Sequence, residues 1–163
     1  MRVLLVLLLL AGCGADDPPL APAGGSCEIE VLSWDWGLTA TPGTTGGGSG
    51  KGKATPKEMR VVHRYDKASP LLGKQAVSGR HIPQAVLSAR KSGEGQMDFF
   101  KVTMKDVFIT SVSVSAAAPD VEAVEEVAMS YRAIEFAYSP QNSKGSLGTP
   151  VQFRWDIRTG TVS

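Results

Sequence analysis

Apolar side chains recur at every second position along parts of this chain, and this period constrains the fold more than any other feature. Apolar and polar residues alternate over 100–104 and again over 151–157. Side chains at alternate positions of a β-strand point to the same face of the sheet. Frequent turn signals separate about seven such stretches, which predicts a mainly β fold: a small β-barrel with one short α-helix packed on it. The alternating apolar residues expected to fill its core are Phe100, Val102, Met104, Val151, Phe153, Trp155 and Ile157.

The apolar positions of residues 127–138 change parity partway along the stretch. They fall on odd numbers as far as Tyr131 and on even numbers from Ile134. One extra residue in a strand swaps the face to which the following side chains point, so the pattern predicts a β-bulge near Arg132–Ala133. Bulges bend strands, which suits a closed or rolled sheet.

One short helix is predicted between strands. Ser69 is a preferred N-cap residue, and Pro70 suits the first helical position because its missing N–H would have no partner there. Gly79 supplies the left-handed residue that commonly ends a helix. We therefore expect a helix that Ser69 caps and that stops at Gly79.

Residues 1–12 have the composition of a secretory signal peptide. Arg2 precedes an unbroken apolar run, Val3–Leu10, which is shorter than the ~20 apolar residues of a transmembrane helix. Leu10-Ala11-Gly12-Cys13 resembles the bacterial lipobox, which implies cleavage before Cys13 and lipid attachment to that residue. The alternative is an ordinary cleaved leader in which Cys13 is incidental.

Residues 13–27 are rich in Pro and Gly and predict a tether between the lipidated Cys13 and a folded domain formed by residues 28–163. Lipidation of Cys13 would leave Cys27 as a free thiol, and a Cys13–Cys27 disulfide in a secreted form is the alternative. The formal net charge is +1, and no basic run is interleaved with aromatic residues. Nucleic acid is therefore not an expected partner.

The stretch from Thr39 to Lys53 is rich in Gly, Ser and Thr. A phosphate-binding loop requires Ser or Thr directly after its Lys, whereas Gly52 follows Lys51 here, and no helix start comes next. We therefore interpret the stretch as a flexible hairpin extension with a basic tip at Lys51 and Lys53.

No group of residues has the spacing of a catalytic or metal site. His63 lies within a predicted strand and His81 follows the helix, and neither belongs to a nucleophile-elbow or paired-histidine motif. Glu125 and Glu126 are adjacent in a strand and so face opposite sides. The sequence predicts no enzyme activity, no metal and no cofactor.

Several segments resemble the tube protein of the bacterial type VI secretion system, the haemolysin-coregulated protein family. The resemblance covers roughly residues 28 to 158. The segments that carry it are Ile29–Gly37, Tyr65–Leu72, Asp106–Ser113, Glu126–Tyr131 and Ile134–Gln141.

The resemblance implies the barrel fold predicted above and a function in self-assembly. Subunits of this family associate side by side, typically as hexamers around a wide pore, and the rings stack into a conduit whose lumen carries small effector proteins. The implied partners are other copies of the chain, effectors, and sheath or spike components. Strand edges are candidates for ring closure, and Thr39–Lys53 is a candidate stacking contact. The candidate interface residues are Trp34, Trp36, Lys51 and Lys53.

Two departures from the family pattern leave alternatives open. Tube proteins lack a cleavable leader, and they begin with a strand for which this chain has the tether instead. A missing first strand would expose a barrel edge, and exposed edges pair with other chains. The alternative is a membrane-tethered adaptor lipoprotein that binds secretion components or another envelope partner by strand addition. A third class is an immunity-type or envelope-binding lipoprotein without a secretion role. The lipobox implies an exported protein anchored to the envelope, with the outer membrane favoured, or else a secreted one.

Overall fold

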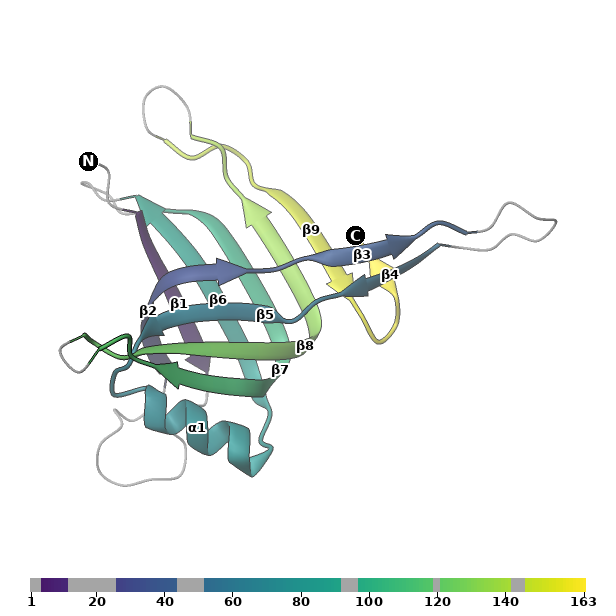
Figure 1. Ribbon diagram of the computed structural model, residues 1–163. Coiled ribbons are helices and arrows are strands. Elements are labelled where there is room, and N and C mark those ends of the chain that lie inside the picture. Colours follow the sequence, from purple (N-terminus) through teal and green to yellow (C-terminus); the bar gives the residue numbers. More distant parts are fainter. Residues whose placement is uncertain (1–3, 12–25, 44–51, 92–96, 119–120, 142–145) are drawn as a thin grey trace.

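The computed structural model describes residues 4–11, 26–43, 52–91, 97–118, 121–141 and 146–163, which form a mainly β structure with one helix (Figure 1). Six strands of an eight-stranded sheet close into a barrel, because β8 pairs with β7 as well as with β5. The predicted fold class is therefore confirmed. The barrel strands, in the order in which they pair, are β8 (Val124–Tyr138), β5 (Met59–Arg64), β2 (Ser26–Asp35), β1 (Leu4–Ala11), β6 (Ile82–Lys91) and β7 (Asp98–Ser115).

The other elements lie outside the closed barrel. β9 (Val151–Asp156) extends the sheet from β8, and the short β10 (Thr161–Val162) extends it from β9. β3 (Leu38–Thr41) and β4 (Lys53–Pro56) pair only with each other in a separate two-stranded sheet. The helix α1 (Ser69–Ser78) lies against β7. Within the described residues, no helix has both the length and the apolar character needed to span a membrane.

The first strand of the barrel is present, which corrects the sequence-based expectation that a tether replaces it. β1 pairs with β2 on one side and with β6 on the other, and β2 begins at Ser26. An unbroken apolar run without alternation can serve equally as a leader or as a buried strand, so the sequence pattern alone did not identify β1. The adaptor alternative rested on an open barrel edge, and the six described barrel strands leave no such edge.

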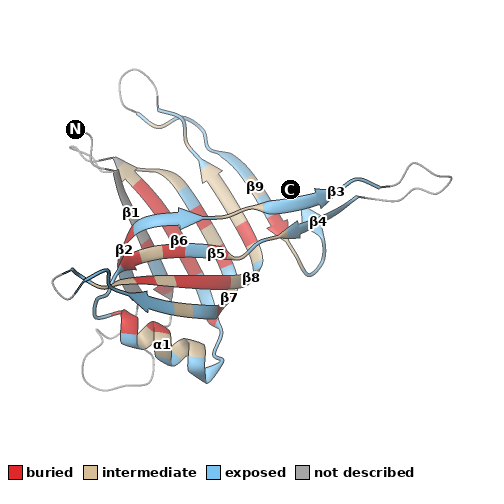
Figure 2. Ribbon diagram, in the orientation of Figure 1, coloured by how far each residue is buried: buried red, intermediate tan, exposed pale blue. Residues whose placement is uncertain are grey.

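Most side chains buried in the barrel are apolar, and Figure 2 shows the buried segments along its strands. The expected alternation in β7 is confirmed, since Val102 and Met104 are fully buried and Phe100 packs against the core. In β9, Trp155 is buried, whereas Val151 is 70% exposed and was wrongly assigned to the core. Val151 lies opposite Tyr138 at the end of β8, beyond the barrel interior. Phe153 and Ile157 pack against the core and are partly buried.

The inside–outside swap in β8 is real, but its cause differs from the predicted bulge. Glu125, Val127 and Met129 are buried, and the next fully buried side chain is Ile134, on the other parity. The pairing with β7 keeps one register across the swap, from Lys105–Ala133 to Val107–Tyr131. β7 swaps faces at the same place, between Met104 and Val107, where Asp106 has a φ of 53°. Both strands therefore swap faces at the same place, and the shift in their register lies further along, between Ile109 and Ser111.

The helix exists where the sequence predicts it, with one change at its start. Ala68 is the N-cap and makes no side-chain capping bond, while Ser69 is already helical. The Ser69 hydroxyl instead accepts a hydrogen bond from the Asp66 backbone N–H at 3.1 Å, and the Asp66 carboxylate accepts one from the Ala68 N–H at 2.8 Å. Gly79 ends the helix with a φ of 65°, as expected for a left-handed C-terminal residue.

Candidate assembly interface

The β3–β4 hairpin projects away from the barrel (Figure 1), and nearly all its residues are exposed (Figure 2). Its four residue pairs run in one register from Leu38–Pro56 to Thr41–Lys53. A two-stranded hairpin without a third strand or a packed helix is only marginally stable in water. The hairpin is therefore a surface on which contact with another molecule would add stability.

A cluster of hydrogen bonds fixes the base of this hairpin to the barrel. The Trp36 indole N–H donates to the Tyr131 hydroxyl, which in turn donates to the Lys57 carbonyl at 2.8 Å. The Lys57 backbone N–H donates to the Gly37 carbonyl at 2.9 Å. Burial raises the pKa of Tyr131 above its ordinary value, and the Trp36 hydrogen bond opposes that rise. We call Trp36, Gly37, Lys57 and Tyr131 the hairpin clamp.

Gly52 allows the two strands of the hairpin to approach closely at the far end of its described part. A Cβ atom at this position would lie 2.8 Å from the Thr41 carbonyl oxygen. Such a separation requires a shift of backbone, so glycine is the residue that this geometry admits.

The candidate interface residues occupy different places. Trp34 stacks on Phe100 with ring centroids 5.6 Å apart, and Trp36 lies 4.6 Å from the ring of Phe136. Lys53 is exposed at the start of β4. Lys51 and the predicted lipid-attachment residue Cys13 lie outside the described residues, so their roles stay predictions. The aromatic rings form a chain of contacts that joins Trp34, Phe100, Phe136, Trp36 and Phe153.

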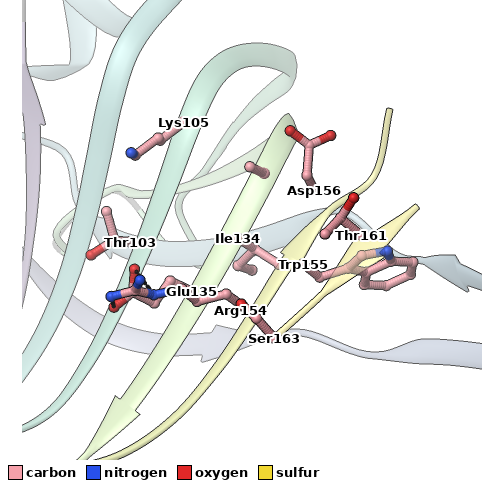
Figure 3. A pocket seen from close by; sticks show the side chains of 10 residues that line it. Thr103, Lys105, Ile134, Glu135, Arg154, Trp155, Asp156, Thr161 and Ser163 are labelled. Carbon is pink, nitrogen blue, oxygen red and sulfur yellow. Dashed lines mark hydrogen bonds and ion pairs between the residues drawn. The ribbon is translucent and has the colours of Figure 1, made fainter. Parts of the chain in front are cut away.

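A shallow pocket of about 170 Å³ lies on β7, β8 and β9, close to the C-terminal residue Ser163 (Figure 3). Its charged side chains include Lys105 and Asp156, and Arg154 contacts Glu135 at 3.0 Å. The Thr159 backbone N–H, which donates to Asp156, lowers the pKa of that carboxyl group. The Glu135 carboxylate in this pocket is thus engaged in an ion pair.

His63 and Glu125 form a buried polar pair that the sequence did not predict. His63 Nε2 lies 2.9 Å from a Glu125 carboxylate oxygen, and each side chain is 1% exposed. They face each other across the β5–β8 ladder, while Glu126 is directed to the opposite, exposed side as expected. Both side chains are buried in the barrel, so the pair is a packed structural element. His81, the other histidine, is exposed, and its Nδ1 lies 2.6 Å from the Oδ1 of Asp106.

No cluster of three His, Cys, Asp or Glu side chains with metal-binding geometry occurs within the described ranges. Sequence reasoning missed the contacts of Tyr131, Lys57 and Glu125, whose partners are 62 to 95 positions away in the chain. Local patterns carry no signal for contacts of that range. The geometry as a whole presents a rigid barrel with a projecting, clamped hairpin.

Comparison with known proteins agrees with this architecture. Residues 22–138 match the family model described as type VI secretion system effector, Hcp. Protein hcp1 from Pseudomonas aeruginosa is 35% identical over 108 residues, which cover 65% of this chain and 67% of that protein. The crystal structure of Hcp1 from Salmonella typhimurium superposes with a TM-score of 0.71 at 28% identity, covering 100% of both chains.

A further solved structure, described as that of a type six secretion system protein, has a TM-score of 0.81. It covers 99% of this chain and 100% of its own and is 23% identical, so it bears on the fold alone. The family match spans well over half of this chain and includes five of the six barrel strands and the β3–β4 hairpin. The chain therefore belongs to the Hcp family of type VI secretion system proteins.

Proposed function

We propose that the chain is a tube subunit of a type VI secretion system, which assembles side by side into rings, hexameric by family resemblance. The rings stack into a conduit that carries small effector proteins and meets sheath and spike components. The barrel supplies a rigid wall, and the protein acts by shape and self-association rather than by catalysis.

One observation carries the stacking part of this proposal: the β3–β4 hairpin is held at its base by the hairpin clamp, yet is exposed along both strands. A hairpin held in place but unsupported on its faces is suited to docking on a neighbouring copy. Side-by-side contacts between subunits close a ring. Rings stack along their axis only if the subunits have a second kind of contact, which the hairpin could supply.

The test separates rings from stacks. Native mass spectrometry of the full chain reports ring formation, and electron microscopy at high protein concentration reports stacking. Leu38→Asp, on the exposed hairpin, should preserve rings and shorten or abolish stacks. Val77→Asp, on the exposed end of α1, is the matched control and should leave both assemblies unchanged. Stacks of normal length with Leu38→Asp would contradict the role of the hairpin.

A second candidate form is an exported lipoprotein, which one specific observation favours: Leu10-Ala11-Gly12-Cys13 follows a short apolar run. Cleavage before Cys13 and lipidation there would anchor residues 13–163 to the bacterial envelope, since acyl chains bury apolar surface in the membrane. Cys13→Ser should move that form out of the membrane fraction. Retention of the Ser variant in the membrane would remove this candidate.

A further inference from the structure

The residues of β1 carry two signals that cannot act in the same molecule. In the sequence, Leu4–Ala11 forms most of the apolar core of a leader that would be cut before Cys13. In the structure, the same residues lie between β2 and β6 as one strand of the closed barrel. β1 also precedes the part of the chain that matches the family model, which begins at residue 22.

Among the described strands, β1 alone connects β2 with β6 by backbone pairing. It pairs with β6 from Leu4–Lys91 to Ala11–Gln84, and with β2 from Leu7–Glu30 to Ala11–Ser26. On their other sides, β2 pairs with β5 and β6 pairs with β7. Loss of β1 would therefore open the barrel and leave two unpaired strand edges.

The side chains of β1 show which positions the barrel needs. Leu8 and Leu10 are 1% and 0% exposed and belong to the core cluster. Leu9, between them, points outward and is 39% exposed. Its direct partner on β2 is Glu28, which is also exposed. The strand thus requires apolar side chains at Leu8 and Leu10 but not at Leu9, whereas a leader requires an uninterrupted apolar run.

We propose that closure of the barrel by β1 and removal of β1 as a leader are mutually exclusive, and that the ring-forming subunit is the uncleaved chain. Hydrolysis of the Gly12–Cys13 peptide bond, with water supplying the new carboxylate oxygen and amine hydrogen, would detach β1 from the rest of the domain. Burial of Leu8 and Leu10 in the barrel withholds the apolar run from any export receptor. The assembly of the uncleaved chain into rings rests on the proposed function, whereas the role of β1 in barrel closure does not.

Two substitutions in the full chain separate the two fates. Leu9→Lys places a positive charge opposite Glu28, where the strand accepts it, but interrupts the apolar run of the leader. It should keep Tm within about 3 °C of the wild type and reduce any cleaved chain by about tenfold or more. Leu8→Ala keeps the run apolar but leaves a cavity in the core, so it should lower Tm by about 5–15 °C without reducing cleavage. Leu9→Ala is the control and should change neither.

Intact-mass spectrometry of assembled and unassembled protein, together with thermal unfolding, decides the matter. We expect every ring to contain chains that retain residues 4–11, and Leu9→Lys to form rings as the wild type does. Rings built from chains that begin at Cys13 would overturn the inference. If no variant forms rings, the proposed function fails separately, and thermal unfolding still decides the role of β1: an unchanged Tm for Leu8→Ala would overturn it.

Discussion

The barrel and the β3–β4 hairpin are built from the same kind of antiparallel pairing, but different forces hold them. Each barrel strand has a neighbour on both sides and an apolar face turned to a common core. The hairpin strands have one neighbour each and no buried face, and the hairpin clamp fixes only their base. The barrel is therefore held by its own core, whereas the hairpin is positioned by the barrel through the hairpin clamp and, under the proposed function, gains stability by contact with another copy.

The strongest test of this contrast removes one partner of the polar pair inside the barrel. Glu125→Ala leaves the buried His63 Nε2 without its hydrogen-bond partner and opens a cavity in the barrel, so it should lower the free energy of unfolding by about 3–5 kcal/mol. Urea unfolding measures the loss. Glu126→Ala is a matched control one residue away on the exposed face, where an ion pair with Arg60 contributes only about 0–1 kcal/mol.

The double variant His63→Leu/Glu125→Leu sharpens that result. Replacing both partners by apolar residues removes the buried unpaired group, so most of the lost stability should return. Equal stability losses for Glu125→Ala and Glu126→Ala would show that the buried pair does not matter to the barrel.

The next test compares leucines in the two regions. Leu10→Ala in β1 removes fully buried methyl groups and should cost about 2–5 kcal/mol. Leu38→Ala in the hairpin removes a partly exposed side chain and should change stability by less than about 0.5 kcal/mol. Denaturant unfolding of the dissociated subunit would measure both changes in stability. Similar costs at the two positions would contradict the assignment of β1 to the core.

A smaller effect is expected at the hairpin clamp, and it depends on pH. Because burial raises the pKa of Tyr131, the unfolded chain releases this proton at a lower pH than the folded chain. Stability should therefore fall as pH rises above about 10, the ordinary tyrosine value. Tyr131→Phe should remove part of that alkaline loss while costing about 1 kcal/mol at neutral pH through its lost hydrogen bonds. An alkaline profile identical to the wild type would exclude Tyr131 as its source.

The smallest effect is expected in the turn between β9 and β10. The Thr159 backbone N–H lowers the pKa of Asp156, so the folded state binds its proton only at lower pH than the unfolded state does. This contribution to stability is present above the ordinary Asp pKa and is lost as pH falls through the lowered one. Asp156→Asn should slightly flatten the acid limb of the stability profile, as measured by urea midpoints between neutral and acid pH. A steeper acid limb in the variant would contradict this.

The sequence predicted what local periodicity encodes. Alternation in residues 100–104 located the buried face of β7, and the Pro70 and Gly79 signals located α1 to within one residue of its start. The parity change in β8 was predicted correctly, although β7 swaps faces at the same place and no register shift marks a bulge there.

What the sequence did not predict depends on contacts between distant segments. β1 has no alternation because its run is apolar throughout, and only its neighbours β2 and β6 decide that Leu8 and Leu10 face inward. The Glu125 carboxylate was correctly separated from Glu126, but nothing local indicates that His63 lies across from it. The hairpin clamp likewise joins distant segments: Tyr131 of β8 contacts residues just before β3 and just after β4, and no local pattern indicates these contacts.

Native mass spectrometry of the full chain at micromolar concentration tests the central claim most directly. A tube subunit predicts one dominant closed assembly, about six times the 17.2 kDa chain mass, in which the dissociated subunits retain residues 4–11. An obligate ring buries enough surface to persist at that concentration. A uniform monomer under the same conditions would contradict the account.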